Sequence, residues 1–100
     1  SPCIPATDPA VADFAAAYQA AFGEAPGTYA AEAYAAASIF LAGIREGIDN
    51  RADMLEFVNN YDEAGITKQL TFDETGEPAD VHVYAYIVEN GEIVPQGEIK

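Results

Sequence analysis

The stretch Thr28–Gly47, TYAAEAYAAASIFLAGIREG, decides the fold class of this chain. It is rich in alanine, which favours helix and lets neighbouring backbones approach closely. Thr28 can cap the start of this helix and Gly47 can end it. A helix that is apolar on several sides is buried between layers of a fold, so we expect this helix to be buried. Its bulky apolar residues point to more than one side: Tyr29, Tyr34, Ile39, Phe40, Leu41 and Ile44.

Two shorter helices are expected on either side of the alanine-rich helix. Thr7-Asp8-Pro9 is a good helix start, and apolar residues at spacings of three and four continue the helix to Phe22, before Gly23. Asn50 can cap a third helix, with Asp53 in its first turn, where the helix dipole favours negative charge. Asn59-Asn60 close this helix, and its expected inner face consists of Met54, Leu55, Phe57 and Val58.

Beyond Gly65 the apolar period changes to two, which predicts strands. We expect strands over residues 66–72, 81–88 and 93–99, with a type I′ hairpin turn at Asn90-Gly91 between the last two. The predicted fold class is therefore α/β, with an α+β order within this chain: three helices followed by a small antiparallel strand set. Residues 1–8 are expected to form an extended arm, and residues 9–100 one domain segment. The strand over 81–88 is apolar on both faces, and it needs more cover than 100 residues easily provide.

The charge of the chain limits its partners. The formal net charge is -13, from 17 acidic and 4 basic residues. Binding to phosphate backbones or anionic lipid needs clustered Lys and Arg, so nucleic acid and anionic membrane surfaces are excluded as expected partners. No apolar run reaches the roughly 20 residues that span a bilayer, and the first residues do not form a signal peptide.

The sequence offers no catalytic or metal-binding constellation. His82 is the only histidine and lies in a predicted strand, without a second group to orient it as a general base. Cys3 is the only cysteine, so it is either a buried thiol or pairs with a cysteine outside these residues. We therefore expect no enzyme, no metal site and no cofactor. The acidic loop fits a calcium site loosely but lacks the closing glutamate, so a solvated turn is the preferred interpretation of Asp73, Thr75, Glu77 and Asp80.

Two residues near the start of the alanine-rich helix are candidate ligand contacts. Tyr29 follows a Pro-Gly turn and can point out of the fold, near a helix N-terminus that attracts carboxylates. The alternative is that Tyr29 packs in the core against the first helix. Glu32 can meet an ammonium group, or it can be a solvent-facing residue that the helix dipole favours.

Several motifs follow one another in a characteristic order over residues 9–96. They are Phe14-x3-Tyr18-x3-Phe22-Gly23-x2-Pro26, Tyr29-Ala30, Ala33-Tyr34-Ala35-Ala36, Gly65-Ile66, Leu70-Thr71-Phe72-Asp73-x2-Gly76, Val83-Tyr84 and Asn90-Gly91. Together they resemble the C-terminal region of branched-chain amino-acid-binding proteins of the type 1 periplasmic binding protein family. The F-D-x-x-G motif at residues 72–76 is the most specific of them.

This resemblance implies a two-lobed α/β fold with the ligand held between the lobes. It also implies an extracytoplasmic solute-binding protein, periplasmic or lipid-anchored, that delivers a branched-chain or related amino acid, or a small amide, to the permease of an ABC importer. Tyr29 falls where family members place an aromatic against the ligand side chain. Ala35 stands where relatives often have an acidic residue, and the groups that hold the ligand's ammonium and carboxylate lie outside this chain. The alternative reading is an autonomous acidic α+β interaction domain that self-associates as a homodimer.

Overall fold

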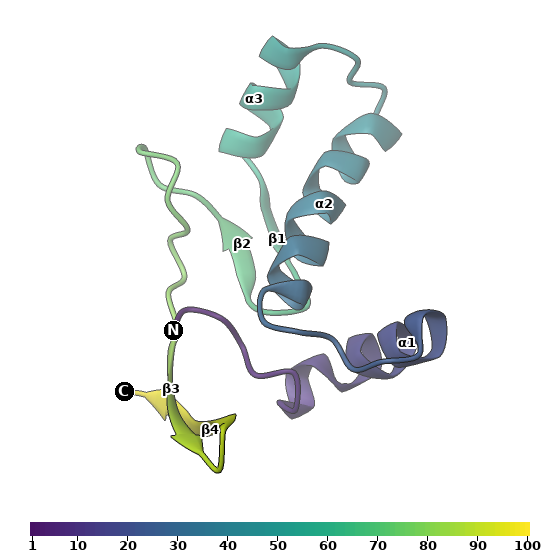
Figure 1. Ribbon diagram of the computed structural model, residues 1–100. Helices are drawn as coiled ribbons and strands as arrows, with labels where there is room; N and C mark the ends of the chain where they lie inside the picture. Colours follow the sequence, from purple (N-terminus) through teal and green to yellow (C-terminus); the bar gives the residue numbers. More distant parts are fainter. The chain divides into compact units, whose positions relative to one another are not determined.

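A computed structural model describes residues 1–100. Its helices are η1 (Pro9–Val11), α1 (Ala12–Phe22), α2 (Ala30–Arg45) and α3 (Arg51–Asn59). Its strands are β1 (Asp62–Ala64), β2 (Gln69–Thr71), β3 (Val83–Glu89) and β4 (Glu92–Ile99), paired as two antiparallel sheets, β1-β2 and β3-β4 (Figure 1). The chain divides into two compact units, residues 1–32 with 81–100, and residues 33–80. The mixture of helices and small antiparallel sheets confirms the predicted fold class.

The first unit contains the β3-β4 hairpin. The strands are in register from Glu89↔Glu92 beside the turn to Val83↔Ile99 at the open end, with one irregularity between Ala85 and Tyr86. Asn90 and Gly91 both have positive φ, 52° and 79°, as a type I′ turn requires. The predicted hairpin is confirmed, although β3 begins at Val83, two residues later than expected.

The N-terminal arm lies beside β3 and supplies much of the buried surface of the first unit (Figure 1). The backbones of Ser1 and Tyr84 exchange two hydrogen bonds: Tyr84 N donates to Ser1 O at 2.7 Å, and Ser1 N donates to Tyr84 O at 2.9 Å. The Tyr86 hydroxyl donates to the Cys3 carbonyl at 2.9 Å. Cys3, only 2% exposed, and Ile4 are buried together with Val11 and Tyr84. Apolar burial of this kind is the main force that holds a small unit together.

The first helical segment begins and ends where the sequence predicts. The Asp8 side chain accepts a hydrogen bond from Ala10 N at 2.9 Å, and the short η1 turn leads directly into α1. Gly23, at φ 79°, ends α1 by donating its N–H to Gln19 O. Phe14, Tyr18 and Phe22 stack along one side of the helix, with ring centroids 5.9 and 4.7 Å apart.

The alanine-rich helix α2 differs from the prediction at its start and agrees at its end. It begins at Ala30, whose N–H donates to Gly27 O, so Thr28 does not cap it and Tyr29 precedes it. At the end, Gly47 N donates to Ile44 O and Ile48 N donates to Gly43 O, the paired bonds of a Schellman motif with Gly47 at φ 92°. The predicted glycine C-cap is therefore confirmed.

The helix α2 is buried on fewer sides than expected. Only one stripe is buried along this helix: Ala31, Ala35, Ile39 and Gly43. These residues recur every four positions and so share one face. The prediction of burial on several sides was wrong for these 100 residues, because their bulky neighbours remain about half exposed: Tyr34, Phe40, Leu41 and Ile44.

The second unit contains α3, which contacts α2 at Gly43. Asn50 caps α3 as predicted: its Oδ1 accepts from Asp53 N at 2.9 Å, and its Nδ2 donates to Asp53 Oδ2 at 2.8 Å. Gly43 lets α3 approach closely, since a Cβ there would lie 2.7 Å from Met54 Sδ. Met54, Phe57 and Val58 are half-buried, but Leu55, expected on the same inner face, is 61% exposed.

The small β1-β2 sheet was only partly anticipated. Asp62↔Thr71, Glu63↔Leu70 and Ala64↔Gln69 pair antiparallel across a turn that Gly65 N closes by donating to Lys68 O at 2.8 Å. The strand predicted over residues 66–72 therefore starts at Gln69, because its first residues form this turn. β1 was not predicted, since Asp62–Ala64 contains two acidic residues and no bulky apolar side chain.

Candidate functional site

Tyr29, the first predicted ligand contact, lies in the loop just before α2. Its side chain is 62% exposed, so it is not a core residue. Its φ of 71° is in the left-handed region, which a residue with a Cβ adopts rarely and at a cost of about 1–2 kcal/mol. The structure therefore presents the tyrosine on the surface of the first unit, on strained backbone.

Glu32, the second predicted contact, lies in the first turn of α2 and faces the N-terminal arm. Its Oε1 accepts a hydrogen bond from Ile4 N at 2.7 Å, a short distance that is typical of a hydrogen bond to a charged acceptor. Its Oε2 is shielded from solvent and has no hydrogen-bond partner. The carboxylate is thus held beneath the arm, and the reading of Glu32 as a solvent-facing residue does not fit the structure.

A cavity of about 240 Å³ lies in the first unit. Its lining includes Thr28, the residue before Tyr29 in the sequence. Three segments form its walls: the arm, the loop before Tyr29, and the hairpin. Its lining carries no charged side chain and includes three prolines. A small apolar group fits such a lining better than a charged one does. The lining residues are Ile4, Pro5, Ala6, Thr7, Pro26, Gly27, Thr28, Tyr86, Ile93 and Pro95.

The surroundings of the two tyrosines on β3 beside the arm raise the pKa of their hydroxyls. Burial, reinforced by the charges of Glu98, Asp8 and Glu32, raises the pKa of the Tyr84 hydroxyl above its ordinary value of 10.0. Burial, with smaller effects from Cys3 and Glu32, also raises the pKa of the Tyr86 hydroxyl. Both hydroxyls therefore stay protonated at neutral pH, and Tyr86 keeps its hydrogen bond to the arm.

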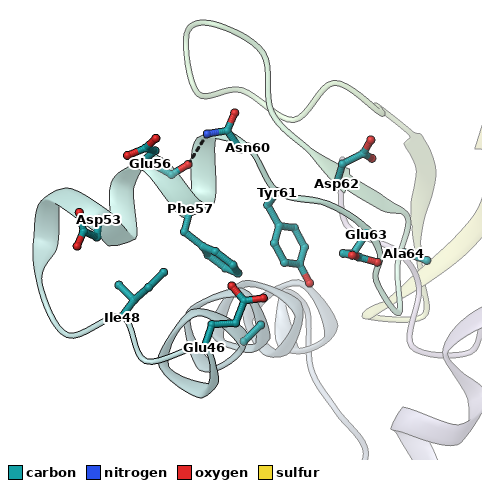
Figure 2. Close-up of a pocket in the computed structure, with 11 residues that line it drawn as sticks. Glu46, Ile48, Asp53, Glu56, Phe57, Asn60, Tyr61, Asp62, Glu63 and Ala64 are labelled. Carbon is teal, nitrogen blue, oxygen red and sulfur yellow. Dashed lines mark hydrogen bonds between the residues drawn. The ribbon is translucent and has the colours of Figure 1, made fainter.

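A larger groove of about 790 Å³ lies in the second unit, between the end of α2, α3 and β1 (Figure 2). The rings of Phe57 and Tyr61 lie in it with centroids 5.6 Å apart, and Glu46 faces them from the end of α2 (Figure 2). Five carboxylates line the groove and no basic side chain does. Its remaining lining residues are Ala42, Ile48, Asp53, Glu56, Asn60, Asp62, Glu63 and Ala64.

The polar groups of this groove are largely exposed, and several are bonded within the chain. Asp62 Oδ1 accepts from Gln69 Nε2 at 2.8 Å, and Asp53 Oδ2 accepts from Asn50 Nδ2. Asn60 Nδ2 donates to the Glu56 carbonyl at 2.9 Å (Figure 2). Water solvates exposed carboxylates well, so this groove has weaker support as a ligand site than the apolar cavity.

The acidic loop after β2 is a self-contained turn, as preferred from the sequence. Asp73 Oδ1 accepts hydrogen bonds from Thr75 Oγ1, Thr75 N and Glu77 N, at 2.6, 2.8 and 3.0 Å. These donors, the Thr75 hydroxyl first, lower the pKa of the Asp73 carboxyl below its ordinary value of 3.8. The carboxylate thus organises the turn of the F-D-x-x-G motif.

His82, the one histidine, pairs with an acid on the neighbouring strand. Its Nδ1 lies 2.7 Å from Glu98 Oε1, and both side chains are about one third exposed. No serine, cysteine or further histidine completes a nucleophile–base set there. The pair links the residue before β3 to β4 at the open end of the hairpin.

The role of the arm could not be foreseen from the sequence. Residues 1–7 have no periodicity, and the hydrogen bond between Ile4 and Glu32 joins positions 28 apart. The buried pair Cys3-Ile4 was the only available signal, because two apolar residues between prolines are unusual in a solvated tail.

Comparison with known proteins places the chain in a family. Residues 2–92 match the family model described as periplasmic binding protein. No curated protein and no solved structure matches the chain. Proteins of this family bind small solutes outside the cytoplasm and are not enzymes. No helix of the structure has the length and apolar character needed to cross a membrane. Because the match covers most of its length, the chain belongs to the periplasmic binding protein family.

Proposed function

We propose that this chain is the C-terminal part of a solute-binding protein that delivers a branched-chain or related amino acid, or a small amide, to the permease of an ABC importer. Its membership of the periplasmic binding protein family supports a solute-binding role. The observation that carries the choice of ligand is the apolar cavity of about 240 Å³, whose lining includes Thr28, the residue before Tyr29.

The lining of this cavity favours an aliphatic group. Ile4, Ile93 and the three prolines offer apolar surface, and the Tyr86 hydroxyl is already bonded to the Cys3 carbonyl. A charged ligand side chain would lose its hydration there without gaining an oppositely charged partner. An aliphatic side chain or the methyl end of a small amide would instead gain from leaving water.

Tyr29 is the residue proposed to contact the ligand. Strained backbone is retained where the surrounding structure or a function requires it, and Tyr29 combines a positive φ with an exposed ring. Thr28, the residue before Tyr29 in the sequence, lines the cavity, and the proposed role of the tyrosine ring is to cover a side chain bound there. Glu32 belongs to the same proposed site from beneath the arm.

The remaining ligand groups need partners from elsewhere. An amino acid carries an ammonium and a carboxylate, and no charged side chain lines the cavity. We propose that a second lobe supplies these partners and covers apolar residues left exposed here, such as Val88 and Ile93.

Replacement of Tyr29 by Ala tests this proposal. In the complete two-lobed protein we expect Tyr29→Ala to weaken leucine binding by about tenfold or more, because the apolar packing of the leucine side chain against the ring is lost. Isothermal titration calorimetry measures the affinity, and Phe22→Ala is the control, since Phe22 is an aromatic residue of comparable exposure, 68%, in the same unit. Unchanged affinity in Tyr29→Ala would contradict the contact, and absence of binding to aliphatic amino acids and amides would contradict the function.

A second candidate function is a self-associating interaction domain. It is favoured by an apolar hollow of about 560 Å³ between α2 and α3, lined by Phe40, Ile44, Ile48, Asp49, Asn50, Arg51, Met54, Leu55 and Val58. Against it, two copies with a net charge of -13 each repel one another. Sedimentation of the chain tests this candidate: a dimer that Leu55→Lys disrupts would support self-association, and a monomer would contradict it.

A further inference from the structure

We propose that Glu32 is a positioning residue: its carboxylate fixes the N-terminal arm, and through the arm one wall of the apolar cavity, without contacting the ligand. The effect on ligand affinity rests on the proposed function. The effect on the arm does not, because it follows from contacts within the first unit alone.

The geometry directs the Glu32 carboxylate to the arm. Ile4 N donates to Glu32 Oε1 at 2.7 Å, and Ile4 is itself buried. Glu32 Oε2 is shielded from solvent, so the group is not turned outward to collect a ligand. Glu32 is also absent from the lining of the cavity, whereas Ile4 and the three residues after it form one wall.

The arm has anchors on two sides, and Glu32 is the anchor on α2. On the other side, Ser1 pairs with the Tyr84 backbone, and the Tyr86 hydroxyl binds the Cys3 carbonyl. Removal of the Glu32 carboxylate would leave the Ile4 N–H buried without an acceptor, which is unfavourable in a folded protein. The arm would then open more readily next to the cavity.

Amide exchange tests the arm without any ligand. In the 100-residue chain, Glu32→Ala should speed hydrogen exchange of the Ile4 amide roughly 10- to 100-fold, the loss expected for a bond to a charged acceptor. Glu32→Gln keeps an oxygen acceptor and should leave the Ile4 amide protected. The Gly23 amide, bonded within the C-terminal turn of α1, is the internal reference. Glu24→Ala removes the same charge from an exposed position of the same unit and should have no effect.

Ligand titration separates positioning from contact. In the complete protein, a positioning role predicts that Glu32→Ala weakens leucine binding while Glu32→Gln binds like the wild type. A carboxylate that pairs with the ligand ammonium predicts that both variants lose affinity equally, because both lose the charge.

The two proposals fail in distinguishable ways. Unchanged exchange of the Ile4 amide in Glu32→Ala would overturn the arm anchor. Equal losses of affinity in Glu32→Gln and Glu32→Ala, with Ile4 still protected in Glu32→Gln, would overturn the positioning role in favour of direct contact. Absence of leucine and amide binding by the wild type would overturn the proposed function, and the exchange rates alone would still decide whether Glu32 holds the arm.

Discussion

Gly43 of α2 and Met54 of α3 are in contact where the second unit is packed. A Cβ on Gly43 would lie 2.7 Å from Met54 Sδ, 3.0 Å from its Cε and 3.2 Å from Phe57 Cδ1. Distances this short mean that neighbouring atoms must move if a side chain is added. Glycine at position 43 therefore lowers the helix propensity of α2, but it leaves room for the Met54 side chain of α3.

We predict that the effect of Gly43→Ala depends on the residue at position 54. Alanine favours helix over glycine by about 1 kcal/mol, so in a Met54→Ala background Gly43→Ala should raise the free energy of unfolding. In the wild type, the flexible Met54 side chain must move aside, so this gain should be smaller. A double-mutant cycle from urea unfolding should give a coupling energy of about 0.5 kcal/mol or more. Additive effects would contradict the contact.

The Asp73 turn should make stability depend on pH at the acidic end. Because its folded-state pKa is lowered below 3.8, Asp73 contributes stability above that value and loses it as the pH falls through the folded pKa. The difference in unfolding free energy between wild type and Asp73→Asn should therefore be largest near neutral pH and shrink in acid.

The cause of this pKa shift can be tested separately from its effect on stability. Thr75→Val removes the hydroxyl that lies 2.6 Å from Asp73 Oδ1, whereas Thr75→Ser retains a hydroxyl there. We expect the NMR titration midpoint of the Asp73 carboxyl to rise in the valine variant and to stay low in the serine variant. Equal midpoints in the two variants would show that backbone donors alone lower the pKa.

The tyrosines beside the arm should make the chain less stable at alkaline pH. Burial raises the folded-state pKa of Tyr84 and Tyr86 above 10.0, so their contribution is fully present below that value and lost as the pH rises through the folded pKa. Tyr86→Phe removes one of these titrations together with the bond to the Cys3 carbonyl. It should lower the unfolding free energy by about 1 kcal/mol at neutral pH and weaken the alkaline dependence. NMR of ring-labelled tyrosine follows each hydroxyl, and a Tyr86 midpoint at 10.0 would contradict the prediction.

Much of the local structure was predictable because short-range chemistry determines it. Asp8 and Asn50 cap helices, Gly23 and Gly47 end them, and the Asn90-Gly91 pair forms the hairpin turn. Each of these depends on residues within a few positions of one another. Local rules of capping and turn formation therefore suffice.

The features that depend on distant contacts were not predictable. The sequence did not indicate that Tyr29 adopts positive φ before α2, nor that the acidic segment Asp62–Ala64 pairs as β1. The same holds for the candidate site: Tyr29 and Glu32 were selected, but the bond from Ile4 to Glu32 spans 28 positions. Periodicity within one element carries no information about such partners.

The irregular outer edge of the hairpin also has a consequence for solubility. Hydrogen-bonded and non-hydrogen-bonded pairs alternate from the turn, so Tyr86↔Pro95 is a non-hydrogen-bonded pair. An N–H at position 95 would point away from β3, and because proline has none, the outer edge of β4 lacks a donor there. The bulge beside Ala85 and Gly97 bends the same edge, and the arm occupies the opposite edge at Tyr84. Neither edge offers a continuous row of free donors and acceptors to a foreign strand. An apolar hairpin that would otherwise template aggregation is thus protected by one proline, one bulge and one arm.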